Sequence, residues 1–500
     1  MSPVKRSPPR PPRLHGLRAW RRAGLKAGIA ALLLAFAAPL AAGPAEDEAL
    51  ARLLERYGRL PPTFFVEWSG EDVLAGRSPR PDPPWATAPF RERIAADFTT
   101  GRYAERHRGV GAGEHRDVGL FLGDGEAVGV DHLARTRWPA EVSGDEKLRA
   151  LAARLPALLA RLLAGGRDRW SAPLPGAIVY QPLDGERWDI AVDTATGRIQ
   201  VLRIAPAGGG EVLRHVYADE VDIGGAWIPR GITRWRGADE DRRWRLERFG
   251  PLDEGGAALA APADYQALEA LPADAFAWRE EKLTDGAWRV GEGASRELFV
   301  AYAGFLVAFG PVDGDARRRI EAARRLSGGL PLRHVVVSHH HQRHLAGLAE
   351  HVRRGARVIA HPDHEAPILA TLRAGGVDPA AVEFQWVSDR YQLTDGVRRV
   401  VVRAVPTPHA EAMLLAFLPD ERLVFAPDLW VAHRVAPEVA TPSMITLNGW
   451  VQTLQPETRA IVDTHSAILL DPAELAAAVV RAAERGLGME RSPGPLMSLR

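Results

Sequence analysis

A histidine-rich segment follows directly on a short apolar run in the C-terminal half of the chain. The run Val335-Val336-Val337 is β-branched throughout, which indicates a buried strand. The segment Ser338-His339-His340-His341-Gln342-Arg343-His344 begins at the next residue. In an extended chain His339 and His341 project to the same side, as two ligands of one metal ion require. This spacing predicts a metal-binding loop at the carboxyl end of a strand.

Single polar residues also stand just beyond the ends of three later apolar runs. His409 closes Pro406-Thr407-Pro408-His409, Asp428 closes Phe425-Ala426-Pro427-Asp428, and His465 closes Val462-Asp463-Thr464-His465. Loops at strand ends are where side chains from separate elements converge on a site. Because the chain has no cysteine, a metal centre here has to be built from histidine and carboxylate ligands.

From Glu281 onward, short strands alternate with helices. The last helix opens with a capping sequence, in which Asp471 is the N-cap, Pro472 takes the first position and Glu474 closes the capping box. Strands buried between helices predict a sandwich of two sheets. The predicted strands are 298–309 (a pair), 334–338, 357–361, 399–405, 413–418, 422–426 and 460–463, and the predicted helices are 315–326, 344–354 and 471–486.

The order and spacing of these motifs resemble those of the metallo-β-lactamase superfamily over most of residues 281–484. Gly347 after the histidines, the turn at 393–396 and the stretch 409–428 are also similar. The resemblance implies an α+β fold class, with a four-layer αββα sandwich, the metallo-β-lactamase fold, over residues 281–486.

The resemblance also implies two metal sites. His339, His341 and His409 would hold the first metal, and His344, Asp428 and His465 the second, with Asp428 bridging. This set implies zinc, as one or two ions, which lowers the pKa of a bound water toward neutrality. The hydroxide so formed attacks a carbonyl or ester. Because Asp428 would bridge the two metals at this point, it is a candidate catalytic residue.

Arg343 departs from the superfamily motif HxHxDH, which has aspartate at this position. A guanidinium is a permanently charged donor, so it cannot ligate a cation and repels one nearby. Three outcomes are open. In the first, the protein is a single-metal hydrolase in which Arg343 binds an anionic substrate group or the oxyanion and is a catalytic residue. In the second, the protein binds metal with weak or no hydrolysis. In the third, Arg343 turns to solvent and leaves the second site partly usable.

The leading hypothesis for function is a zinc-dependent hydrolase that acts on a small-molecule ester, lactone, thioester or amide. A second is an enzyme with a single iron, similar to the persulfide dioxygenases of the same superfamily, whose ligands match His339, His409 and Asp428. A third is a non-catalytic periplasmic binding or scaffold protein that retains the fold. The balance of 64 basic and 63 acidic residues leaves no net field that would recruit nucleic acid.

The first 45 residues predict an export signal. A basic stretch runs to Lys26, and an apolar run at 27–40 and a set of small residues follow it. The pair Arg21-Arg22 resembles the twin-arginine signal, and a general secretory peptide is the alternative. The apolar run is too short for a comfortable membrane span, and Ala42 and Ala45 offer cleavage sites. We therefore expect a periplasmic or secreted protein without a stable membrane span after cleavage.

Residues 46–262 predict a mainly antiparallel β domain, because several runs alternate apolar and polar residues. One leucine-rich helix interrupts them; Ser143 and Glu146 form its capping box, and Pro156 is expected to kink or split it. Through segments 193–197 and 222–229, this part resembles the lipoprotein-carrier-like β domains of some exported bacterial proteins. A linker is predicted at 263–280, and a mobile tail at 487–500.

Ten other histidines, all beyond the predicted export signal, have no ligand spacing, so we expect them at the surface, in the core or behind the ligands. His351 and His433 also have no predicted partner. The set comprises His107, His115, His132 and His215 in the first half, and His334, His340, His351, His361, His364 and His433 in the second.

Overall fold

The computed structural model describes residues 44–486, except 112, 184, 253–258, 270–276, 294 and 431–436. The predicted export signal lies almost entirely outside the described residues, as do the predicted tail, part of the predicted linker and His433. Strands predominate and several helices pack on them, so the predicted α+β class is confirmed. Among the described residues, no helix combines the length and the apolar character needed to cross a bilayer.

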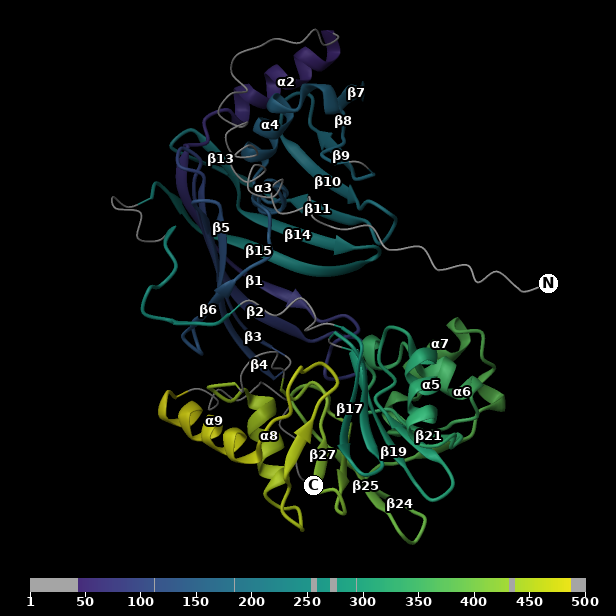
Figure 1. The fold of residues 1–500 in the computed structure, drawn as a ribbon. Helices are drawn as coiled ribbons and strands as arrows, with labels where there is room; N and C mark the ends of the chain where they lie inside the picture. Colours follow the sequence, from purple (N-terminus) through teal and green to yellow (C-terminus); the bar gives the residue numbers. More distant parts are fainter. Residues whose placement is uncertain are drawn as a thin grey trace, which may run out of the picture.

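The N-terminal part is built on one large, mainly antiparallel sheet with the spatial order β16-β6-β5-β4-β3-β2-β1-β15-β14-β11-β10-β9-β8-β7 (Figure 1). Neighbouring strands pair antiparallel, as β1 does with β2, whereas β16 joins β6 in parallel. Alternation explains the strands: in β10, Ile199, Leu202 and Ile204 are buried and the residues between them are not. The strands are β1 (Thr63–Val73), β2 (Thr87–Asp97), β3 (Arg102–Gly111), β4 (Glu114–Gly123), β5 (Glu126–Asp131), β6 (Thr136–Pro139), β7 (Trp170–Leu174), β8 (Ala177–Tyr180), β9 (Arg187–Val192), β10 (Ile199–Ala205), β11 (Leu213–Tyr217), β14 (Gly231–Arg236), β15 (Asp239–Gly250) and β16 (Gln266–Ala267), and β12 (Glu220–Ile223) and β13 (Ala226–Pro229) form a separate hairpin.

Three helices pack on this sheet: α2 (Pro44–Tyr57), α3 (Gly144–Ala152) and α4 (Pro156–Gly165). The side chain of Ser143 accepts a hydrogen bond from the amide of Glu146 and so caps α3, as expected. Pro156 separates α3 from α4 because its ring is compatible with the first turn of a helix but not with the interior of one.

The C-terminal part contains two further sheets. The first runs in chain order through β17 to β23; its first four strands pair antiparallel, and β20 to β23 pair in parallel. The second runs from β24 to β28, and only its last pair is parallel. The strands of the first are β17 (Arg279–Thr284), β18 (Ala287–Glu292), β19 (Ser295–Ala301), β20 (Leu306–Phe309), β21 (Leu332–Val336), β22 (Arg357–Ala360) and β23 (Phe384–Trp386), and those of the second are β24 (Arg390–Thr394), β25 (Arg399–Val405), β26 (Met413–Leu418), β27 (Leu423–Phe425) and β28 (Ala460–Val462).

These two sheets pack on each other through a shared core that includes Phe309 and Val336 from one and Leu414 and Phe425 from the other. Helices α5 (Ala316–Leu326), α6 (Leu348–Arg353) and α7 (Glu365–Ala374) cover the outer face of the first sheet, and α8 (Pro442–Val451) and α9 (Pro472–Glu484) cover that of the second (Figure 1). Because β21 is covered on both faces, its apolar run is continuous rather than alternating.

The helix predicted at 344–354 begins later than expected, at Leu348. A short 3-10 turn, Gln342–His344, comes first, closed by a hydrogen bond from the His344 amide to the His341 carbonyl (2.9 Å). Gly347, just after this tight turn, packs directly against the backbone carbonyl of Val312. A Cβ at position 347 would stand 2.8 Å from that oxygen, so the close approach at the start of the helix requires glycine. His344 is therefore a loop residue.

Candidate metal centre

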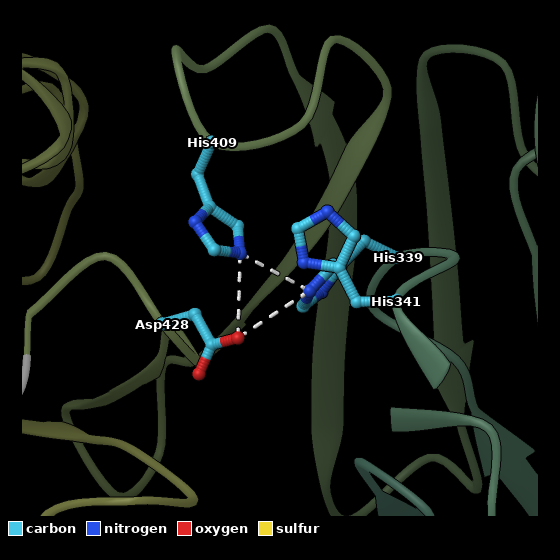
Figure 2. Close-up of side chains that lie close together, drawn as sticks. All are labelled: His339, His341, His409 and Asp428. Carbon is cyan, nitrogen blue, oxygen red and sulfur yellow. Dashed lines mark hydrogen bonds and ion pairs between the residues drawn. The ribbon is translucent and has the colours of Figure 1, made fainter. Parts of the chain in front are cut away.

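The six predicted ligands come together at one edge, where strands of both C-terminal sheets end. His339, His341 and His344 follow β21 in the first sheet, and His409 follows β25 in the second. Asp428 and His465 follow the parallel strands β27 and β28, which run side by side and so deliver both residues to the same end of the second sheet. Figure 2 shows His339, His341 and His409 gathered around the Asp428 carboxylate.

A first group of ligand atoms belongs to His339, His341, His409 and Asp428, and these atoms all lie within 4.8 Å of one another. His409 Nε2 is 3.3 Å from His339 Nε2 and 3.3 Å from Asp428 Oδ2. His339 Nε2 is 3.5 Å from the same oxygen. Three histidines and one carboxylate from three separate strand ends thus face a single point.

A second group consists of His344, Asp428 and His465. His344 Nε2 lies 2.8 Å from Asp428 Oδ2, and His465 Nε2 lies 3.4 Å from Asp428 Oδ1. The two imidazoles are also close, with their Nε2 atoms 3.1 Å apart. Asp428 belongs to both groups, so its carboxylate stands where a bridging ligand would.

Burial keeps two of the ligand rings, those of His339 and His341, in the neutral form that binds metal. It lowers the pKa of His341 to about 2 and the pKa of His339 well below its usual value, and neighbouring histidines add to both effects. Burial also raises the pKa of Asp428, but the electrostatic interaction with His344 and hydrogen bonds from the surrounding histidines outweigh it and hold that pKa well below the ordinary value. Imidazoles and a carboxylate are the donors that zinc and other divalent transition metals take, so the residues fit such an ion.

Asp463 holds the two ligand-bearing loops of the second sheet. It is fully buried, and its Oδ1 accepts the amide of Asp428 (2.9 Å) while its Oδ2 accepts the amide of His465 (2.9 Å) and the hydroxyl of Ser466 (2.8 Å). Asp428 has a φ of 60°, in the left-handed region that costs energy for any residue except glycine. The Asp463 carboxylate therefore stabilises a backbone conformation that aims Asp428 at the histidines.

Arg343 is in neither ligand group. Its side chain is 57% exposed, and its Nε donates to Asp313 Oδ2 at 3.1 Å. Burial raises the pKa of Asp313, but hydrogen bonds from Ser295 and Arg343 outweigh it and hold that pKa below its usual value. The guanidinium thus lies against Asp313 and solvent and not among the candidate ligands; which of the three outcomes for the second site holds stays a prediction.

Comparisons with known proteins give structural neighbours only. No family model matches the chain, and no curated protein matches it. A metallo-β-lactamase from Pontibacter korlensis is similar to this chain at 16% identity and a TM-score of 0.32; the match covers 41% of this chain and 97% of the Pontibacter protein. The mono-zinc form of the metallo-β-lactamase FIM-1 from Pseudomonas aeruginosa is similar to 42% of the chain over 96% of its own, at 15% identity and a TM-score of 0.31. The flavodiiron protein from Giardia intestinalis is similar to 41% of the chain over 59% of its own, at 14% identity and a TM-score of 0.33.

One histidine expected to have no partner is part of a buried cluster behind the site. His351 Nε2 lies 2.6 Å from Glu297 Oε1, and Arg319 Nε donates to Glu297 Oε2 at 3.2 Å, with all three side chains fully buried. Arg319 also donates to the carbonyls of Val312 and Asp313 and so fixes the loop that meets Arg343. The expectation for His351 was wrong because Glu297 lies on β19, far away in sequence.

Three residues that bear on the site were not singled out from the sequence: Asp463, Asp313 and Ser78. Asp463 stands at a strand end two residues before His465, so the same signal that marked His465 would have found it. Asp313 follows β20 and Ser78 follows β1, in loops with no ligand spacing. The roles of these two residues depend on contacts across long stretches of chain.

Proposed function

We propose that this protein is an exported, zinc-dependent hydrolase of the metallo-β-lactamase superfamily, with a four-layer αββα C-terminal domain, that acts on a small ester, lactone, thioester or amide. The observation that carries the proposal is the convergence of five imidazoles, three of which are drawn in Figure 2, on the Asp428 carboxylate from the ends of two sheets. A zinc ion held by these ligands supplies Lewis acidity, which activates water at neutral pH and stabilises an oxyanion.

The two ligand groups have unequal roles in this proposal. The first offers four protein ligands and the second three, with Asp428 shared, so the first group binds its ion more tightly. Because Arg343 is held by Asp313, its positive charge is directed away and the second group stays available for a weaker ion. Asp463 orients Asp428 and His465, and the ligand imidazoles are buried.

A second candidate is an iron enzyme of the persulfide dioxygenase type. The observation in its favour is that His339 Nε2, His409 Nε2 and Asp428 Oδ2 lie 3.3 to 3.5 Å apart, with one carboxylate among two imidazoles. Two histidines and one carboxylate on one face are the ligands that mononuclear non-haem iron takes. The two candidates differ in the metal, not in these three residues.

Metal content measured beside an activity panel tests the proposal. The purified protein is analysed for zinc and iron and assayed on esters, lactones, thioesters, β-lactams and persulfide. Zinc with turnover of an acyl substrate is the expected result, and iron with persulfide oxidation would favour the second candidate. Protein that stays metal-free in zinc-replete medium would overturn both and favour a non-catalytic binding protein.

The His339→Ala variant should lose the metal of the first group and all activity. His132→Ala is its control, because His132 lies in the N-terminal part and its ring nitrogen is hydrogen-bonded to Tyr265 (3.0 Å). Turnover that survives His339→Ala would exclude the metal mechanism. Export is tested separately, by locating the full-length protein in cell fractions; a cytoplasmic product would contradict that part of the proposal.

A further inference from the structure

A loop from the N-terminal part reaches the metal centre. Residues 74–86 connect β1 to β2, and Ser78 in this loop is only 2% exposed. The backbone carbonyl of Ser78 lies 2.9 Å from His340 Nε2 and 3.1 Å from His341 Nε2. A carbonyl oxygen only accepts hydrogen bonds, so both Nε2 atoms carry the hydrogen.

Other contacts hold the loop in place. The Ser78 hydroxyl accepts the amide of Ala86 at 3.0 Å, which closes the loop on itself. Beyond Ser78, the carbonyl of Pro79 accepts the amide of Glu411 at 3.0 Å, and Arg80 Nε donates to both carboxylate oxygens of Glu411 at 2.8 and 2.9 Å. Glu411 is two residues beyond the ligand His409, so the loop is bonded to two of the three segments that carry ligands of the first group.

A second N-terminal loop touches the same region. The carbonyl of Gly113, between β3 and β4, accepts the amide of Ser443 at 3.2 Å. A Cβ at Gly113 would stand 3.0 Å from Pro408 and 1.9 Å from the Ser443 hydroxyl, so only glycine fits there. Figure 1 shows the ends of β1 to β4 meeting the C-terminal part.

The hydrogen bond to Ser78 decides which nitrogen of His341 is free. Because Nε2–H is donated to the carbonyl, only Nδ1 keeps a lone pair for an ion. An acceptor of this kind also holds the ring plane and makes the free nitrogen a better ligand. In the first ligand group, His341 is the histidine whose orientation depends on a segment outside the two C-terminal sheets.

We propose that Ser78 is a positioning residue: its carbonyl, carried by residues 74–86, fixes the tautomer and ring orientation of His341, so the N-terminal part completes the first metal-binding group. This inference rests on the proposed function, since it requires the group to bind an ion. It assigns the N-terminal part a role in metal affinity.

A hairpin variant tests the proposal. Val73 and Thr87 are directly paired across β1 and β2, so residues 74–86 can be replaced by Asn-Gly, a two-residue turn that suits such a hairpin. We expect the tighter zinc site to bind roughly 10- to 100-fold more weakly, as is typical when the partner of a ligand histidine is lost. The cobalt-substituted protein should also show altered visible absorption bands, because the ligand field of the ion changes.

The matched control replaces residues 205–212, which are the last residue of β10 and the loop to β11 in the same sheet, by Asn-Gly, since Ile204 and Leu213 are directly paired. That change should leave zinc affinity and the cobalt spectrum as in the wild type. Unchanged affinity and spectrum in the 74–86 variant would overturn the inference, while the proposed function would stand. A wild-type protein that binds no zinc would overturn the proposed function and this inference together.

A measurement on the wild type covers the case in which the shortened variant does not fold. In zinc-loaded protein labelled with ¹⁵N-histidine, long-range nitrogen–proton spectra should show His341 with a protonated Nε2 and a metal-bound Nδ1. A protonated Nδ1 with a metal-bound Nε2 would overturn the inference.

Discussion

Replacing Asp463 by alanine should destabilise the fold and weaken metal binding together. Its buried carboxylate accepts three hydrogen bonds, from the amides of Asp428 and His465 and from the hydroxyl of Ser466. Each hydrogen bond to a charged acceptor contributes about 1.5–3 kcal/mol, so the upper limit for the three is about 9 kcal/mol. Because the three donors share one carboxylate and the loops relax, we expect a loss of about 4 kcal/mol in the free energy of unfolding.

The stability of the metal-free protein is measured by urea denaturation, and zinc affinity by competition with a chelator. A loss of about 4 kcal/mol corresponds to a fall in Tm of roughly 10 °C for a unit of about 200 residues. Zinc affinity should fall roughly 10- to 100-fold, because Asp428 is no longer held in its left-handed conformation. Asp471→Ala is the control: Asp471 also accepts a backbone amide, at the start of α9, but touches no ligand, so its loss should cost about 1 kcal/mol and leave zinc affinity unchanged.

An Asp463→Ala protein with wild-type stability and wild-type zinc affinity would refute the role given to this carboxylate. Normal zinc affinity with lowered stability would show that Asp463 stabilises the fold but does not contribute to metal binding. Lowered affinity with normal stability would show that the ligand loops are held independently of the core.

Two further predictions concern Arg343 and His215. Arg343→Asp should tighten the second metal site, seen as zinc content closer to two ions per chain and faster turnover of a generic ester, because a carboxylate ligand is added at the start of the loop that carries His344; unchanged zinc content would show that the side chain at position 343 does not reach the second ligand group. Burial, with the charges of Arg234 and Arg154, lowers the pKa of His215 to about 3. As the pH falls from about 6.5 toward 3, the unfolded chain therefore binds a proton at His215 that the folded chain does not bind. Stability should therefore decrease by about 2 kcal/mol between pH 7.5 and pH 5 through this residue, and His215→Phe should remove that part of the pH dependence in urea denaturation curves; the same slope in both proteins would refute the assignment.

Much of the C-terminal part follows from local sequence patterns. The helix capped by Asp471, the apolar run before His339 and the polar residues after β25, β27 and β28 all depend on neighbours a few residues away. Helix capping and runs of apolar residues act over this short range, so the strand ends and the residues placed on them could be predicted. The start of α6 was wrong by four residues, because packing of Gly347 against the loop after β20 governs it.

The sequence by itself determined the set of candidate ligands, because a residue at the end of a predicted strand has its place set by local backbone geometry. Only the tertiary structure decided how that set is supported. Arg343 turns to Asp313, 30 residues away, and His341 donates to Ser78, 263 residues away. Such contacts depend on how sheets and loops from distant segments pack, and no periodicity or spacing in the chain encodes which carbonyl or carboxylate will face a given side chain.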